Sequence, residues 1–288
     1  MPELPEVETT ARSLHRHVAG DVIESVWIGD KSNLLKSPAD EIARTLEGSR
    51  IDCVRRVGKH IVIDLHRDHD GSTSTHSPRA SRRIVPPGAQ AQWVVHLGMT
   101  GRMLVCDPAA ERAKHTHLVA QLASGRELRF VDPRRFGKLQ VISGASFQAP
   151  GSEPIGANRE EFAKLFHGRR TPIKSALLNQ KLLSGIGNIY ADESLFRAAI
   201  RPRRRAASLT RAELSRLYDA IQEVLAEAIA AGGSSISDYV DAAGDAGFFQ
   251  LQHRVYGRED EPCLVCKSPI RRIVIAGRSS HYCPRCQK

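Results

Sequence analysis

The sequence predicts an α+β protein of two domains that ends in a metal-binding hairpin, and three observations lead to this fold class. Short β-branched segments separated by turn residues fill the N-terminal half, which is typical of an antiparallel sheet. Helical patterns replace them after Ala149-Pro150-Gly151-Ser152. Four cysteines then stand near the end of the chain as C-x2-C-x16-C-x2-C. We therefore expect a β-sandwich domain with a flanking helix (1–149), a helical domain (150–257) and a cysteine hairpin (258–288).

The N-terminal half is expected to contain one helix followed by strands. The helix begins at Pro5, a residue tolerated in the first turn, and Gly20 ends it, with an apolar face made of Val7, Ala11, Leu14 and Val18. The strand-like segments are 22–28, 51–65, 92–97, 117–122, 127–131 and 139–142. Residues 67–91 are rich in Ser, Thr, His, Arg and Pro without periodicity, so we expect a mobile basic loop there.

The second half is expected to contain four helices. Their predicted starts are a capping box of Asn158 with Glu161, then Thr171-Pro172, then the residues after Arg201-Pro202, and a second capping box of Thr210 with Glu213. The first would run through Phe166, the second would carry Leu177, Leu178, Leu182 and Leu183 up to Gly185-Ile186-Gly187, and the last would end at Gly232-Gly233.

The four C-terminal cysteines predict a structural zinc site. Two CxxC pairs, Cys263 with Cys266 and Cys283 with Cys286, can offer four thiolates to one tetrahedral ion across a β-hairpin. The alternative, two disulfides, is disfavoured because the chain shows no export signal. Cys53 and Cys106 stand apart in apolar segments, where we expect buried thiols.

Charge and composition limit the classes of partner. Forty-two Lys and Arg residues against 32 Asp and Glu give a net charge of +10, which suits either a polyanionic partner or simple solubility. No apolar segment has the roughly 18 residues of a membrane span, and the acidic N-terminus does not have the layout of a signal peptide. We expect a cytoplasmic monomer with no membrane partner.

Four separated motifs resemble those of the formamidopyrimidine-DNA glycosylase family, in the family's order and over nearly the whole chain. They are Met1-Pro2-Glu3-Leu4-Pro5-Glu6-Val7-Glu8, Asp132-Pro133-Arg134-Arg135-Phe136-Gly137, Gly187-Asn188-Ile189-Tyr190-Ala191 and the tail cysteines. The resemblance implies a helix–two-turn–helix module, a zinc finger and a bacterial base-excision repair enzyme. Such an enzyme excises oxidised purines from double-stranded DNA and then cleaves the strand.

The resemblance assigns catalytic roles to four residues. Removal of Met1 would leave Pro2 with a secondary amine, and an α-amino group titrates near pH 7.7–8.0, roughly, so that a fraction is nucleophilic at neutral pH. Glu3 is the expected acid–base partner. Lys59 resembles the family's proton donor for β-elimination, and Arg278 resembles the arginine that holds the phosphate in δ-elimination. The role of Glu6 is left open: it is either a catalytic residue or a charge that stabilises the N-terminal end of the helix.

The resemblance also implies a set of DNA contacts. A base must leave the duplex before it is attacked, and Met99, Arg134 and Phe136 match the residues that fill the void, with Arg134 facing the orphaned cytosine. The positions that match phosphate contacts are His115, Arg169, Lys174, Asn188 and Tyr256.

Two other functions remain as alternatives. One is a glycosylase resembling endonuclease VIII, which removes oxidised pyrimidines; the other is a non-catalytic DNA-binding zinc protein. The intact Pro2-Glu3 favours an enzyme. The purine branch is favoured by Leu4-Pro5, by Arg134 with Phe136, and by the Gly-containing segment 237–250.

Overall fold

The computed structural model describes the whole chain except residues 1, 31, 68–90 and 237–238, so the predicted basic loop and the start of segment 237–250 lie outside the described residues. The chain forms two compact units. The N-terminal unit contains Pro2, the described residues of 7–148 and residues 239–246. The C-terminal unit contains residues 3–6, 149–236 and 247–288. Two short segments thus cross the predicted division after residue 149, and the zinc hairpin belongs to the C-terminal unit.

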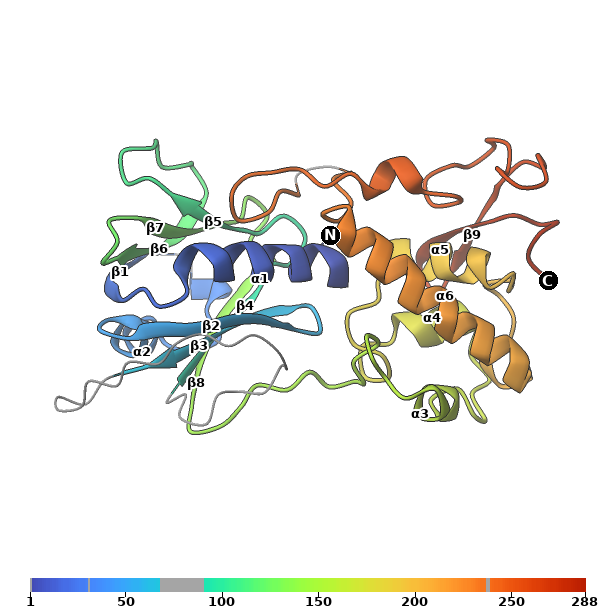
Figure 1. Ribbon diagram of the computed structural model, residues 1–288, viewed down its shortest axis with the longest axis horizontal. Helices are drawn as coiled ribbons and strands as arrows, with labels where there is room; N and C mark the ends of the chain where they lie inside the picture. Colours follow the sequence, from blue (N-terminus) through green and yellow to red (C-terminus); the bar gives the residue numbers. More distant parts are fainter. Residues whose placement is uncertain (1, 31, 68–90, 237–238) are drawn as a thin grey trace. The chain divides into compact units, whose positions relative to one another are not determined.

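The N-terminal unit is an antiparallel β-sandwich, as predicted. One sheet has the strand order β1-β6-β7-β5 and the other β2-β3-β4-β8. Figure 1 shows one sheet above and one below α1. The elements are α1 Leu4–Val18, β1 Ile23–Ile28, α2 Ala39–Leu46, β2 Arg50–Val57, β3 His60–His66, β4 Ala91–His96, β5 Arg102–Cys106, β6 Thr116–Leu122, β7 Glu127–Val131 and β8 Lys138–Ser143, with a 3₁₀ turn at Ser32–Leu34.

The core of this unit lies between the sheets and α1. The predicted apolar face of the helix is confirmed, since its four residues are buried in one cluster with side chains of both sheets. Trp93 on β4 is fully buried and is among the largest side chains of that cluster. Burial of these side chains ties the helix to the sandwich.

Two expectations for this unit were wrong, and two elements were missed. The segment 51–65 forms two strands, because Gly58 adopts φ +59 and turns the chain at Gly58-Lys59. Cys53 and Cys106 are only half-buried. The sequence analysis also gave no element at 39–46 or 102–106, where α2 and β5 lie.

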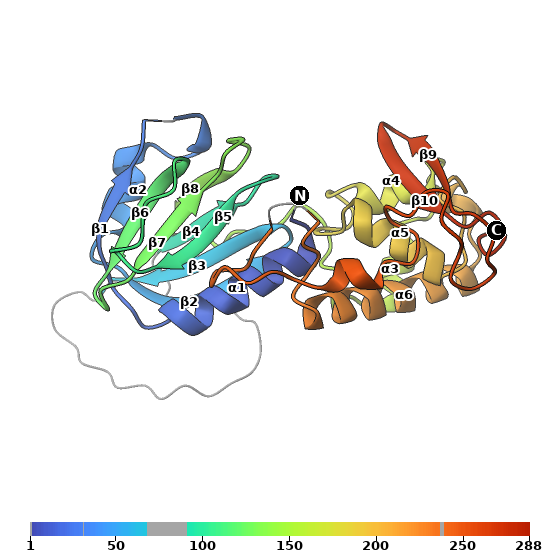
Figure 2. The same ribbon diagram turned by 90° about the horizontal axis from the view of Figure 1, so that it is seen from above.

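The C-terminal unit consists of helices and a two-stranded hairpin (Figure 2). Its elements are α3 Arg159–Lys164, α4 Ile173–Leu178, α5 Asn188–Arg197, α6 Arg211–Ala230, β9 Arg271–Ile275 and β10 Arg278–Tyr282, with 3₁₀ turns at Ala206–Ser208 and Phe249–Gln252. Both strands of the hairpin meet in a turn at Ala276-Gly277, where both residues have positive φ. The predicted β-hairpin between the cysteine pairs is confirmed.

The predicted helix starts agree with the structure better than the predicted helix ends. Thr210 and Glu213 form a reciprocal capping box, and the Asn158 side chain accepts from the amides of Glu160 and Glu161. However, α3 ends at Lys164, and α4 ends before Leu182 and Leu183. The separate helix predicted directly after Arg201-Pro202 is absent, because the described chain has only a 3₁₀ turn at Ala206–Ser208 before α6 begins. In the described part of the chain, no helix is long and apolar enough to cross a membrane.

Candidate functional site

Glu3 is held at the N-terminus of α5 in the C-terminal unit. The side chain is 3% exposed, and its two carboxylate oxygens accept hydrogen bonds from Ile189 N at 3.2 Å and Tyr190 N at 3.5 Å. These amides are among those that a helix start leaves without partners, so a carboxylate is favoured there by hydrogen bonding and by the helix dipole. Gly187 precedes this turn and leaves room for the Glu3 carboxylate.

Glu6 holds Glu3 and a neighbouring loop in place. One carboxylate oxygen accepts from Glu3 N at 2.8 Å, and the other accepts from Ser234 N at 2.8 Å and from the Tyr190 hydroxyl. Burial raises the pKa of Glu6, although these hydrogen bonds act in the opposite direction. The pKa of Tyr190 is also raised, by burial first and by the Glu6 charge second. Glu6 therefore links the backbone of Glu3 to Ser234 and Tyr190.

The three predicted void-filling residues lie on two loops of the N-terminal unit that touch one another. Met99 is 39% exposed and Phe136 is 50% exposed, so both large apolar side chains are accessible to solvent. The Arg134 guanidinium lies 4.9 Å from the centre of the Phe136 ring. A Cβ on Gly98, which has φ +67, would lie 2.5 Å from Gly137 N, so only glycine permits this close approach of the two backbones.

Asp132 fixes both of these loops and was not singled out from the sequence. Its buried carboxylate accepts from Thr100 Oγ1 at 2.6 Å, from Gly137 N at 2.8 Å and from Arg134 N at 3.3 Å. Its own backbone amide donates to the carbonyl of His115 at 3.0 Å. The predicted phosphate contact His115 is thereby tied to the loop that carries Arg134 and Phe136.

Lys59 lies in the turn between β2 and β3, close to a pair of half-buried imidazoles. The ring centres of His60 and His96 are 4.9 Å apart. Burial lowers the pKa of both histidines to about 4, and the neighbouring Lys59 charge contributes for His96. His96 accepts from Gly98 N at 3.1 Å, so it also supports the loop of Met99. The sequence analysis missed this pair because only the fold brings β3 and β4 into register.

The buried ion pair Arg56–Glu8 supports the same turn. The Nε atom of Arg56 is 2.8 Å from a Glu8 oxygen, and its Nη1 atom donates to the Gly58 carbonyl at 3.0 Å. Both side chains are almost inaccessible. The carbonyl that precedes Lys59 is therefore held by a guanidinium anchored on α1.

In the C-terminal unit the structure brings Lys174, Asn188 and Tyr256 close to the strand that begins with Arg278. Asn188 is the first residue of α5, and its amide donates to Ser279 Oγ at 3.3 Å. Burial raises the pKa of Tyr256, and a hydrogen bond with the Asn188 side chain counteracts this shift. Arg278 is exposed at the start of β10. Arg169 lies in a different loop, after α3, where it is exposed and donates to the Leu165 carbonyl at 2.5 Å.

Two predicted contacts have unexpected surroundings. Lys174 is completely buried, and its ammonium group lies among protein partners. Tyr256 is held through its backbone by the buried Glu193, whose carboxylate accepts from the amides of Arg254, Val255 and Tyr256 at 2.8–3.0 Å. Nothing in the sequence connects Glu193 with residues about 60 positions later, which is why it was missed.

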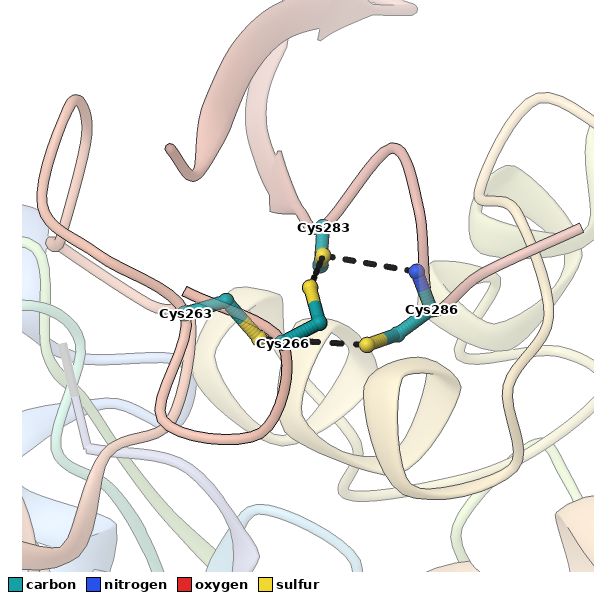
Figure 3. A group of neighbouring side chains, drawn as sticks. All are labelled: Cys263, Cys266, Cys283 and Cys286. Atoms are coloured by element: carbon teal, nitrogen blue, oxygen red, sulfur yellow. Dashed lines mark hydrogen bonds between the residues drawn. The ribbon is translucent and has the colours of Figure 1, made fainter. Parts of the chain in front are cut away.

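The four tail cysteines meet as predicted, as Figure 3 shows. Their sulfur atoms all lie within 4.8 Å of one another, with 3.4 Å between Cys266 and Cys283 and 3.9 Å between Cys263 and Cys286. A tetrahedral zinc ion with Zn–S bonds of about 2.3 Å places its sulfurs about 3.8 Å apart, so this donor set fits the ion. All four protein ligands are present, which makes the site structural rather than catalytic.

A cavity of about 740 Å³ lies elsewhere in the C-terminal unit, between α3 and α6. Its lining includes Lys164, His167 and Leu214 but none of the predicted site residues. This cavity is therefore not part of the candidate site.

Comparisons with known proteins agree with this geometry along the whole chain. Residues 1–139 match the formamidopyrimidine-DNA glycosylase N-terminal domain, residues 150–240 match the H2TH domain of the same enzymes, and residues 260–288 match a zinc finger found in FPG and IleRS. The predicted helix–two-turn–helix module and zinc finger are confirmed. The four cysteines hold a structural zinc ion.

Whole-chain relatives lead to the same family. Formamidopyrimidine-DNA glycosylases of Solibacter usitatus and Listeria monocytogenes are 43% and 36% identical to this chain, and the alignments cover 100% of each chain. Among solved structures, the MutM (Fpg) protein of Thermus thermophilus has 39% identity and a TM-score of 0.81, with 99% of this chain and 98% of that chain covered. A Lactococcus lactis Fpg variant in complex with Fapy-dG-containing DNA has 31% identity and a TM-score of 0.84 over 100% of both chains. The chain belongs to the formamidopyrimidine-DNA glycosylase family.

Proposed function

We propose that this glycosylase excises oxidised purines, namely 8-oxoguanine and formamidopyrimidines, from double-stranded DNA and then cleaves the strand as an AP lyase. The observation that carries the proposal is Glu3: a buried carboxylate, next to Pro2 in the chain, fixed by two amides of α5. Relatives solved with Fapy-dG-containing DNA and with abasic-site DNA support a damaged duplex as the substrate. A net charge of +10 favours a phosphate backbone as the partner.

The proposed chemistry begins at the amine of Pro2 once Met1 has been removed. The nitrogen forms a bond to C1′ of the damaged nucleotide while the bond from C1′ to the base breaks. Glu3 donates a proton to the sugar oxygen as the ring opens, which leaves an iminium ion between C1′ and Pro2. Because the iminium withdraws electrons, C2′ loses a proton and the C3′–O bond breaks in β-elimination. A second elimination then breaks the C5′–O bond.

Two cations assist the departure of the phosphates in this proposal. Lys59, in the β2–β3 turn, donates a proton during β-elimination. Arg278 stabilises the phosphate that leaves in δ-elimination through its charge and fork of donors, since a guanidinium does not give up its proton at this pH. In this proposal the zinc ion stabilises the hairpin that carries Arg278 and so keeps this arginine in a fixed position.

The DNA contacts in the proposal follow from the two touching loops and from α5. Met99 and Phe136 enter the stack when the damaged nucleotide leaves it, and Arg134 donates to the orphaned cytosine. His115, Arg169, Asn188 and Tyr256 contact phosphates on either side of the lesion. Asn188 lies at the start of a helix, a place that suits anions.

The test is borohydride trapping on a duplex that contains 8-oxoguanine opposite cytosine. The reductant converts the iminium into a stable enzyme–DNA adduct, and Pro2→Gly should reduce trapping while preserving duplex affinity. Peptide mapping should place the adduct on the N-terminal residue; an adduct on a lysine would overturn the proposal. Faster excision of oxidised pyrimidines would favour the endonuclease VIII-like alternative, and binding without any adduct would favour the non-catalytic one.

A further inference from the structure

Lys174 on α4 has no exposed surface, although its counterparts among the predicted phosphate contacts lie at least partly in solvent. Its Nζ atom lies 2.7 Å from Oδ1 of Asp192, which is also fully buried. The same ammonium donates to the carbonyl of Ser279 at 2.5 Å. The ammonium group of Lys174 is therefore held by an internal carboxylate and a backbone carbonyl.

Asp192 on α5 reaches the same strand through its other oxygen. Its Oδ2 atom accepts from the backbone amide of His281 at 2.8 Å. In an antiparallel hairpin only every second residue of a strand points its backbone groups at the partner strand. Arg278 lies opposite Ile275 across the two-residue turn, and Ser280 pairs with Ile273. The backbone groups of Ser279 and His281 therefore point away from β9, toward the open edge of the hairpin.

The Lys174–Asp192 ion pair thus provides both a hydrogen-bond donor and a hydrogen-bond acceptor for the backbone groups at this open edge. The ammonium meets the carbonyl of Ser279, and the carboxylate meets the amide of His281. Asn188 adds a side-chain bond to Ser279. Arg278 directly precedes Ser279. The position of Arg278 relative to α4 and α5 therefore depends on these hydrogen bonds.

We propose that Lys174 is not a phosphate ligand but a positioning residue, which docks the edge of β10 on α4 and α5 together with Asp192. This inference rests on the proposed function only for the role of Arg278. Burial lowers the pKa of Lys174, and the charge of Asp192 opposes that shift, as expected for a buried cation whose main partner is a carboxylate. Two buried charges of opposite sign depend on each other, because loss of one leaves the other unpaired.

The experiment is a double-variant cycle on duplex affinity, measured on DNA with a non-cleavable abasic analogue over a range of salt concentrations. Lys174→Met removes the ammonium partner of the buried Asp192 carboxylate, which then keeps only the backbone amide and the ring Nδ1 of His281, at 2.8 Å and 3.3 Å. It should weaken binding about tenfold, a typical size for coupled neighbours. The double variant Lys174→Met/Asp192→Asn removes both charges while the new amide oxygen can still accept from His281 N. It should recover most of the lost affinity, with the salt slope of the wild type. Lys164→Met, which removes an exposed lysine of the same unit, is the charge-matched control.

If Lys174 were a phosphate ligand, the double variant and the salt slope would give a different result. The double variant would then bind as weakly as Lys174→Met, and the salt slope would fall by about one; this result would overturn the inference. If a single variant fails to fold, the double variant alone decides through its affinity and salt slope, once its zinc content is shown to match the wild type. Trapping at Pro2 is measured separately, so failure of the proposed chemistry leaves this result intact.

Discussion

Gly187 and Glu3 are packed so closely that no side chain fits at position 187. A Cβ atom there would lie 2.2 Å from the Glu3 carboxyl carbon and 2.4 Å from one of its oxygens. The glycine is therefore required by the carboxylate rather than by the turn: its φ of −126° is open to any residue.

Gly187→Ala should impair catalysis more than folding. The added methyl group must push Glu3 away from Ile189 N and Tyr190 N, and a displacement of about 1 Å in a catalytic group can cost about 100-fold in rate. Single-turnover excision of 8-oxoguanine measures the loss. The control is Gly156→Ala, where a Cβ meets open space and only the backbone conformation is strained. An unchanged rate for Gly187→Ala would show that the position of Glu3 is unimportant for the reaction.

Removal of zinc should abolish duplex affinity before it disturbs the β-sandwich. The metal supplies the folding free energy of the hairpin that carries Arg278. Both tryptophans of the chain, Trp27 and Trp93, belong to the N-terminal unit, so intrinsic fluorescence follows that unit alone. Chelation or Cys283→Ser should eliminate binding while the fluorescence stays native, and Cys53→Ser should leave both unchanged. Full affinity after complete loss of the metal would contradict this expectation.

Arg134→Ala should remove the preference for cytosine opposite the lesion. Cytosine offers two acceptors to a guanidinium, whereas adenine presents a donor amine, and a bidentate pair is worth about 1–3 kcal/mol, or about tenfold to hundredfold in rate ratio. The measurement is excision opposite cytosine and opposite adenine. Arg135→Ala, at the neighbouring exposed arginine, is the control. Equal losses against both bases, with a salt slope lower by about one, would identify Arg134 as a phosphate contact only.

Acid should destabilise the N-terminal unit through His60 and His96. Their pKa values are lowered from 6.5 to about 4 by burial, so the unfolded chain binds protons that the folded chain rejects. Stability is therefore complete above pH 6.5 and falls as the pH drops toward 4, by about 3 kcal/mol for each ring. Urea unfolding at pH 7, 5.5 and 4.5 measures the decline. His60→Gln should flatten it relative to the wild type, and an identical decline would show that the carboxylates alone cause it.

Hydrophobic periodicity and residue spacing were sufficient to predict the elements whose structure is determined locally. The apolar face of α1, the Thr210–Glu213 capping box and the meeting of the four cysteines each depend on residues close in sequence or on strict spacing. The end of α4 could not be predicted, because Leu182 and Leu183 continue its apolar pattern although the helix ends before them. Burial of such residues is visible in a sequence, but the backbone conformation that buries them is not.

The candidate site also has a part that could be predicted from the sequence and a part that could not. Glu3 and Arg134 belong to recognisable motifs, but the contacts that hold the site residues cannot be read from those motifs. Asp132 acts through backbone amides, Glu193 binds a segment about 60 residues away, and Asp192 meets Lys174 from another helix. Such partners are determined by tertiary packing. The sequence alone does not distinguish a charged residue that is exposed from one that is buried.

The carboxylate of Asp132 has a consequence for how such an enzyme can evolve. It binds the side chain next to Met99 and the amide of Arg134 at once, and Gly98 meets Gly137 beside it. A substitution that moves one loop must therefore move the other. If Met99 enters the base stack and Arg134 binds the opposite base, as proposed above, these two functions should change together whenever either loop is exchanged.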